Sequence, residues 1–155
     1  MKYLIIFLIS MVPIAELRVA MVYATGHGLP FYAALPICVL GNMLPVPFIY
    51  LLARKVLLWG ANKKYIGKMF TFILEKGEKV GQKLVKKTGR GGLFFALMLF
   101  VGIPIPGTGA WTGALGASFL NMGVKSTAVA VGLGVVMAGV IMALLSSGVF
   151  SLIGL

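Results

Sequence analysis

The sequence predicts an all-α integral membrane protein that forms a single membrane domain, residues 1–155. Hydrophobic residues make up 60% of the chain and charged residues only 11%, whereas soluble domains are about 45–50% apolar and about 25% charged. Of the 14 Lys and Arg, all but Lys2, Arg18 and Lys125 lie within residues 54–90. Positive charge beside membrane segments stays in the cytoplasm. We therefore expect a multi-pass protein of the inner (cytoplasmic) cell membrane, with residues 54–91 on the cytoplasmic side.

The lengths of the apolar stretches predict re-entrant hairpins as well as spanning helices. Five stretches are present: residues 3–15, 17–25, 29–53, 93–121 and 124–155. As helices, the first two would reach only about 20 Å or less, and the hydrocarbon core of a bilayer is about 30 Å thick. Between them Pro13 breaks the helix, and Glu16 and Arg18 follow. A chain that has entered the membrane can turn back at such a point.

The second half of the chain repeats this order. The run 92–103 ends at Pro104-Ile105-Pro106-Gly107-Thr108-Gly109, a second short run covers 110–121, and a long segment starts at residue 124. With residues 54–91 inside, the first hairpin enters from outside and the second from the cytoplasm, so that Lys125 also falls inside. We expect an inverted repeat, residues 1–53 and 92–155, each a re-entrant hairpin plus a transmembrane helix. Such repeats place transport sites at the membrane midplane, where the helices are interrupted.

Two other interpretations of the N-terminal segment stay open. Residues 1–15 could form one short crossing followed by an interfacial loop, which leaves residues 17–25 without a role. They could also form a signal peptide with Lys2 as its charged start, although Pro13-Ile14-Ala15 supplies only one small residue for a cleavage site.

The basic segment, residues 54–91, is expected to contain an amphipathic helix between the two halves. Its apolar residues recur among the lysines at a period close to 3.6: Ile66, Met69, Phe70, Ile73, Val80 and Leu84. This apolar face can lie on the inner membrane surface or against the protein's own cytoplasmic side. We expect Glu75 and Glu78 to be solvated, with weak pairing to lysines of the same helix.

Composition excludes chemistry that needs clusters of acid–base or metal-binding groups. The chain has no Asp, one His and one cysteine, Cys38, so neither a disulfide framework nor a cysteine metal site can form. We expect no enzyme activity, no cofactor and no metal. The net charge of +11 predicts contact with anionic membrane lipids rather than with nucleic acid.

Glu16 and Arg18 are the ionisable residues that the first hairpin places at membrane depth, where such groups mark proton or substrate paths. We expect Glu16 to couple transport to a proton or ion, because burial favours its neutral form. The alternative is a favourable charge in the first turn of its own helix. Arg18 presents a fork of donors that suits an anion. Residues two apart on a helix do not face each other, so either the backbone is irregular or each side chain has another partner.

The second turn supplies further candidate residues. Thr108 and Gly109 can cap the helix that follows and leave its free N–H groups for an anion. Gly109, Gly113 and Gly116 can equally serve close helix packing. Trp111 can line the site or simply pack.

Asn42 is a polar residue in the middle of the first long apolar segment, shortly before Pro45 and Pro47. A buried amide needs a hydrogen-bond partner, and the prolines release backbone carbonyls. We expect Asn42 to belong to the substrate site, where it can orient Arg18 or Glu16. An ordinary hydrogen bond between helices is the alternative.

These segments resemble the small multidrug export protein family, a branch of the wider DedA-type membrane proteins. The resemblance covers nearly the whole chain and rests on Pro13-Ile14-Ala15-Glu16-Leu17-Arg18, on Gly41-Asn42 with the prolines after it, on the basic segment, and on Pro104-Ile105-Pro106-Gly107-Thr108-Gly109-Ala110-Trp111. It implies paired re-entrant hairpins and the movement of lipid phosphates such as undecaprenyl phosphate, coupled to an ion gradient. Carried over by position, the transport site comprises Glu16, Arg18, Pro104, Pro106, Gly107, Thr108, Gly109 and Trp111. DedA-type proteins often carry a further arginine motif in the second hairpin, which is uncharged here.

The expected function is that of a secondary transporter, coupled to a proton or sodium ion, for a lipid-linked phosphate or another amphipathic anion. Arg18 and the helix end at Thr108 hold the anion, and Glu16 exchanges the proton. One alternative is a proton-coupled exporter of lipophilic cationic drugs that bind Glu16 directly. Another is a membrane adaptor that transports nothing. Stripes of small residues predict a homodimer.

Overall fold

A computed structural model describes residues 1–105 and 107–153, which are helical with short connections. Pro106, one of the predicted site residues, lies outside the described residues. The helices of the described part are α1 (Lys2–Met11), α2 (Glu16–Gly26), α3 (Phe31–Met43), α4 (Pro45–Ala61), α5 (Gly67–Gly102), α6 (Ala110–Phe119) and α7 (Val124–Ile153). The structure therefore confirms the all-α class within this part of the chain.

Two helical segments are long and apolar enough to cross a membrane, as judged by length and composition. The first is Phe31–Ala61, in which α4 follows α3 almost directly, with a mean hydropathy of 1.9. The second is Val124–Val149 of α7, with a mean hydropathy of 2.6. Large apolar side chains on these segments are at least half exposed: Leu40, Phe48, Leu52, Leu133 and Leu144. Because soluble monomers rarely expose large apolar patches, these surfaces suit contact with lipid.

The first long segment extends further than predicted. The sequence predicts an apolar segment over residues 29–53 that gives way to the basic segment at Arg54, but α4 continues to Ala61. Arg54 and Lys55 therefore lie within a helix, and the connection to α5 is only residues 62–66. The prediction failed at this boundary because charged residues end an apolar stretch without ending a helix, since Lys and Arg are good helix formers.

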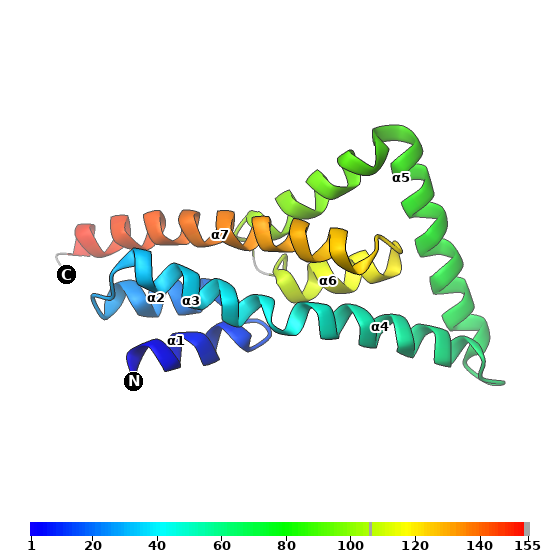
Figure 1. Ribbon diagram of the computed structural model, residues 1–155, viewed down its shortest axis with the longest axis horizontal. Coiled ribbons are helices and arrows are strands. Elements are labelled where there is room, and N and C mark those ends of the chain that lie inside the picture. The colour runs from blue at the N-terminus through cyan, green and yellow to red at the C-terminus, as the bar shows by residue number, and fades with distance from the viewer. Residues whose placement is uncertain (106, 154–155) are drawn as a thin grey trace.

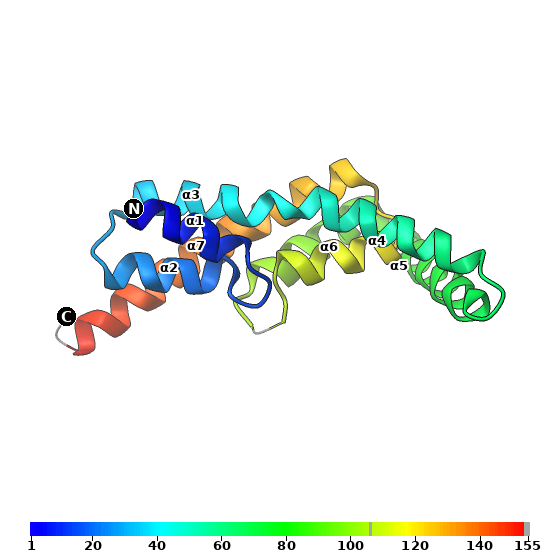
Figure 2. The ribbon, with the colours of Figure 1, turned by 90° about the horizontal axis from the view of Figure 1, so that it is seen from below.

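The first half has the predicted short helix, break, short helix and long segment, whereas in the second half the first short run is the end of the longer helix α5. In the first half, α1 and α2 flank a turn at residues 12–15, where Ile14 has φ of 80° and Glu16 has φ of 49°. In the second half, the end of α5 and α6 flank residues 103–109. The two hairpins run toward the middle of the molecule from opposite ends, and their turns lie side by side there (Figures 1 and 2).

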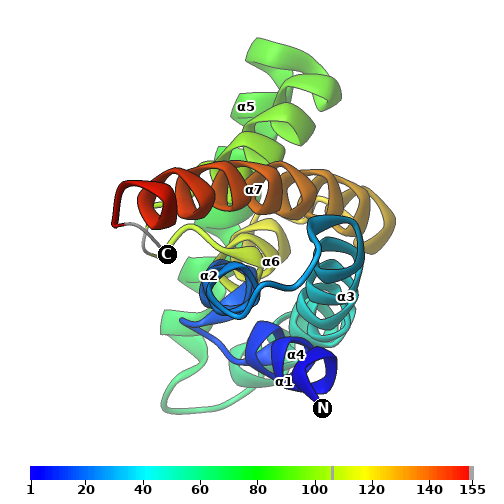
Figure 3. The same cartoon turned by 90° about the vertical axis from the view of Figure 1, so that its left-hand side faces the viewer.

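Helix α2 lies at the centre of the bundle. Seen from the end, it is surrounded by α1, α3 and α7 (Figure 3), and it contacts all three. One side of α2 is almost fully buried through Leu17, Ala20, Met21 and Ala24. The small residues at positions 20 and 24 let the neighbouring helices approach closely. This packing holds the first turn of α2, and with it Glu16 and Arg18, in a fixed place.

Helix α5 is longer than the predicted amphipathic helix and is bent. It runs as one element from Gly67 to Gly102, with a kink at Gly89, whose φ of 73° and ψ of 172° are not helical. The first limb, residues 67–88, and the second limb, residues 90–102, diverge from this kink (Figure 1). A side chain at Gly89 would be strained, because L residues rarely adopt such a conformation. From the kink the second limb returns toward α7, whereas the first limb leads up to the kink from the end of α4 at a steep angle (Figure 1).

The first limb of α5 packs against the protein on one side, which is one of the two alternatives predicted for it. Added Cβ atoms at Gly77 and Gly81 would lie only 2.3 Å from the Phe119 carbonyl oxygen and 2.7 Å from that of Leu120, so this side packs against the end of α6. Other apolar residues of the limb, among them Met69, Phe72 and Val80, stay exposed. One side of the limb therefore rests on the protein, while exposed apolar side chains remain free to contact lipid.

Candidate functional site

The turns of the two hairpins are joined through Arg18, in the first turn of α2. Its guanidinium donates hydrogen bonds to the Thr108 hydroxyl at 2.9 Å, to the Ile103 carbonyl oxygen at 3.3 Å, and to the carbonyl oxygen of Ile105. The planar fork of an arginine can serve several acceptors at once. The positive charge of the first hairpin is thus held in the backbone turn of the second.

The Thr108 hydroxyl belongs to the same cluster. It lies 2.9 Å from the Ile103 carbonyl oxygen and 2.8 Å from that of Ile105, and it can donate its single hydrogen to one of them at a time. Helix α6 begins after Gly109 and has no side-chain cap. Of the two predicted caps, Gly109 occupies the N-cap position, whereas Thr108 does not cap the helix because its hydroxyl contacts the carbonyls of the turn instead.

Glu16 lies at the free end of α6. The Trp111 N–H donates to Glu16 Oε1 at 3.4 Å, and a Cβ at Gly109 would lie only 1.6 Å from Glu16 Oε2. Only glycine at position 109 leaves room for this carboxylate, which is 6% exposed. A negative charge is favoured at a helix N-terminus, where N–H groups and the helix dipole present positive charge. Glu16 thus contacts the end of a helix from the other half of the chain.

The backbone and the partners together explain why Glu16 and Arg18 can lie two residues apart. Glu16 has φ of 49°, so the start of α2 is irregular. Among the described residues, Glu16 and Arg18 form no ion pair within 4.0 Å, and each contacts the second hairpin. Both parts of the expectation, an irregular backbone and separate partners, hold in the structure.

Asn42, on α3, shares a small cavity with these two residues. The cavity has a volume of about 10 Å³, which is close to the space of one water molecule. Its lining comprises Glu16, Leu17, Arg18, Asn42, Val101, Gly109, Ala110, Val135 and Ala138. The Asn42 side chain is 2% exposed, and its Oδ1 has no hydrogen-bond partner among the described residues. Buried polar atoms are rarely left without one, so this oxygen stands as an open acceptor.

The remaining predicted residues have different surroundings. The Trp111 side chain is half-buried, and its indole Nε1 has no acceptor in the described part of the chain. Gly107 has φ of 87°, and an added Cβ there would meet no atom within 4 Å, so it shapes the turn without lining the cavity. Pro104 is half-buried in the same turn and is also absent from the lining.

Sequence reasoning missed the backbone carbonyls of Ile103 and Ile105 as acceptors for Arg18. A signal for them exists, because both residues precede a proline. Proline has no N–H and disfavours helical geometry in the residue before it, so carbonyls in such a turn lack regular helical partners.

Close helix packing was predicted for Gly113 and Gly116 as well as for Gly109, and the structure shows it for only one of the first two. Gly113 packs against Val101, whereas an added Cβ at Gly116 would meet nothing within 4 Å.

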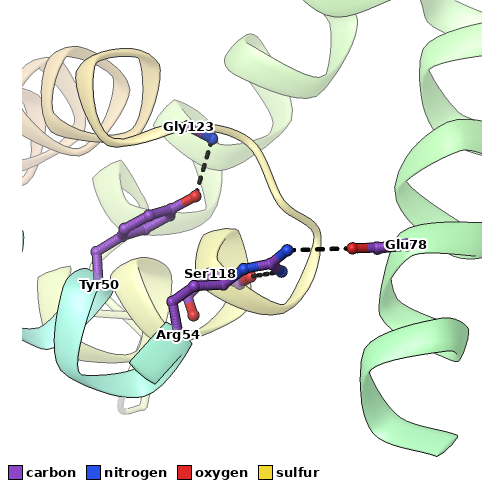
Figure 4. A network of polar contacts seen from close by, with 5 residues as sticks. All are labelled: Tyr50, Arg54, Glu78, Ser118 and Gly123. Atoms are coloured by element: carbon purple, nitrogen blue, oxygen red, sulfur yellow. Dashed lines mark hydrogen bonds and ion pairs between the residues drawn. The ribbon is translucent and has the colours of Figure 1, made fainter. Parts of the chain in front are cut away.

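A second polar network connects α4, α5 and the connection between α6 and α7 (Figure 4). Arg54 donates to Glu78 at 3.1 Å and to the Ser118 carbonyl oxygen at 3.5 Å, and the Gly123 N–H donates to the Tyr50 hydroxyl at 2.9 Å. We expected weak pairing of Glu78 with lysines of its own helix, but in the structure Glu78 pairs with Arg54 of α4. Tyr50 was not predicted as part of any site.

Comparison with known proteins gives one match. The model of the family described as "Putative small multi-drug export protein" matches residues 16–141. This range includes the start of α2, both long helical segments over most of their length, and the whole second hairpin. No curated protein and no solved structure matches the chain.

Proposed function

The chain belongs to the small multi-drug export protein family, whose model covers most of its length, and we propose that it is a secondary transporter of amphipathic anions such as lipid-linked phosphates. The proposal includes coupling to a proton through Glu16. It also includes an inverted repeat in which the two hairpins re-enter the membrane from opposite sides. Transport sites of inverted-repeat transporters lie where the interrupted helices of the two repeats meet.

The observation that supports this proposal best is the contact between the two hairpin turns. Arg18 and Glu16 reach from the first hairpin into the second, and the second hairpin offers the free end of α6. An arginine fork beside a helix N-terminus is a suitable site for a phosphate or carboxylate group. The exposed apolar side chains on both long helical segments fit a substrate with a lipid tail that stays in the bilayer.

The Glu16 carboxylate occupies the position where such an anion would bind. The adjoining cavity, about 10 Å³, has no room for a phosphate group beside it. We infer that the anion binds only after Glu16 leaves α6. Protonation removes the negative charge that the helix end attracts, and the Asn42 Oδ1 atom in the same cavity then offers an acceptor to the neutral carboxyl group. Proton and anion therefore bind together, which couples their movement in the same direction.

Flux into proteoliposomes tests this function. The purified chain is supplied with a phosphorylated polyprenol or with a lipophilic cation, at several values of the pH gradient. We expect proton-dependent flux of the phosphorylated lipid, its loss in Arg18→Ala, and partial retention in Arg18→Lys. Glu16→Gln should still bind the anion but should lose the dependence on the gradient. Unchanged anion flux in Arg18→Ala would exclude the proposed role of Arg18.

A second candidate function is proton-coupled export of lipophilic cations, since the family description names multi-drug export. Glu16 is then the binding residue, because a buried carboxylate at membrane depth can hold either a proton or a cation. The same assay separates the two functions. Cation flux that Glu16→Gln abolishes and Arg18→Ala spares would support the cation exporter.

A further inference from the structure

A large cavity lies between the two limbs of α5 and the connection from α6 to α7, away from the hairpin turns. Its volume is about 630 Å³, within the range of about 300–1,000 Å³ that is common for ligand sites. Lys86 and Arg90 line it from either side of the kink at Gly89, and Ser126 lines it from the first turn of α7. Val85, Leu93 and Met122 supply an apolar part. The cavity thus joins two cations to an apolar wall.

The electrostatics of this cavity favour an anion. Glu78 is the acidic residue in its lining, and its charge is partly offset by Arg54, 3.1 Å away. The first turn of α7 contains no acidic residue but does contain Lys125. The positive end of the α7 dipole adds to these cations. A phosphate group can accept paired hydrogen bonds from an arginine and further bonds from Lys86 and Ser126.

The walls of the cavity are held by specific backbone contacts. Gly89, Asn121 and Gly123 have φ of 73°, 55° and 89°, which fix the bend in α5 and the turn before α7. The Gly123 N–H is bound by the Tyr50 hydroxyl, and Gly81 packs against the Leu120 carbonyl. The concave shape is therefore a property of the fold rather than of flexible lysine side chains alone.

We propose that this cavity binds the phosphate of an anionic phospholipid, with Lys86, Arg90 and Ser126 on the headgroup and the apolar wall against the first methylene groups of the tails. Free phosphate would use the cations but leave Val85, Leu93 and Met122 without a partner. The proposal commits to a lipid for this reason. It does not depend on the transport function proposed for the hairpin turns.

Native mass spectrometry of the full chain with phosphatidylglycerol and phosphatidylcholine tests the proposal. The double variant Lys86→Gln/Arg90→Gln is compared with Lys83→Gln/Lys87→Gln, which removes the same charge from exposed positions of α5 before the kink that do not line the cavity. We expect the first pair to weaken phosphatidylglycerol binding at least about tenfold more than the second, since charge-assisted bonds to phosphate are lost only there. Equal effects of the two pairs would overturn the site.

One further variant distinguishes a phospholipid from free inorganic phosphate as the ligand. A spectroscopic measurement checks that each variant is folded. Val85→Trp fills the apolar wall without a change in charge, and should weaken phosphatidylglycerol binding while leaving binding of inorganic phosphate unchanged. Phosphate binding that depends on Lys86 and Arg90, together with lipid binding that Val85→Trp leaves intact, would overturn the lipid as occupant. Circular dichroism of each variant shows whether its helix content is retained, so that a binding loss can be assigned to the site.

Discussion

The two ends of α6 are held by side chains of opposite charge from the first half of the chain. At its N-terminus lies the carboxylate of Glu16, and near its C-terminus the guanidinium of Arg54 contacts the Ser118 carbonyl. Both charges complement the helix dipole, but their surroundings differ. Glu16 is 6% exposed, whereas the side chains of Arg54 and Glu78 are 22% and 43% exposed. Burial raises the free-energy cost of losing the partner of Glu16, whereas solvent exposure limits the stability that the Arg54–Glu78 ion pair contributes.

Among the substitutions at the two ends of α6, Gly109→Ala should lower the free energy of unfolding most. The new Cβ would lie 1.6 Å from Glu16 Oε2, so the carboxylate must leave the end of α6. We expect a loss of about 3 kcal/mol in the free energy of unfolding, because the buried carboxylate is left without its partner at the helix end. Denaturant unfolding in detergent, followed by circular dichroism, measures it. Gly116→Ala is the matched control, because its Cβ meets nothing; equal stability of the two variants would contradict the close contact.

The next effect in size is expected for Arg18→Ala. The substitution removes the donors to the Ile103 and Ile105 carbonyls and to Thr108, at a cost of about 2 kcal/mol for hydrogen bonds from a charged group. Arg18→Lys keeps the charge without the fork and should lose less. The same unfolding experiment measures both variants. Similar losses in the two would show that the fork geometry contributes nothing.

At the other end of α6, Tyr50→Phe removes the acceptor of the Gly123 N–H. We expect a loss of about 1 kcal/mol, the usual contribution of one neutral hydrogen bond. Hydrogen exchange of the Gly123 amide should also accelerate, since its protection depends on that bond. If the Gly123 amide exchanges at the same rate in both proteins, the Tyr50 hydroxyl is not its partner.

The smallest effect is expected for Glu78→Gln. An ion pair of this exposure is worth about 0–1 kcal/mol and is screened by salt. The stability difference between wild type and variant should therefore shrink as salt is raised from low to high concentration. A large stability difference between wild type and Glu78→Gln that does not change with salt would mean that the Arg54–Glu78 pair is buried. The two ends of α6 would then not differ in the exposure of their charged partners.

The helix order of the hairpins could be predicted because it depends on local properties. Two apolar runs too short to span a membrane, separated by Pro13 and charges, already define a turn between short helices. The kink in α5 could not be placed in this way, since Gly89 is one of several glycines in residues 89–92 and only tertiary packing decides which one bends. The local sequence pattern therefore predicts the short helices of the hairpins but not the position of the kink in α5.

Several residues of the candidate site were predicted to lie together, but their contacts were not predicted. Glu16, Arg18, Asn42, Gly109 and Trp111 do lie together. The sequence suggested Thr108 and Gly109 as caps of α6 and, as an alternative role for Glu16, a charge in the first turn of its own helix, because capping rules consider neighbours along the chain. Glu16 does lie in the first turn of α2, and Gly109 is the N-cap of α6. In the structure the end of α6 is served by a residue of the other half, and no local rule contains such a contact.

The distance along the chain between Glu16 and its partner also bears on biosynthesis. Ninety-five residues separate Glu16 from Trp111, and ribosomes add about 5–20 residues per second. For roughly 5–20 s the nascent first hairpin holds a carboxylate and a guanidinium whose partners have not yet been made. During that interval the two charges must stay hydrated or be held by the insertion machinery. The second hairpin then supplies the partners of both charges.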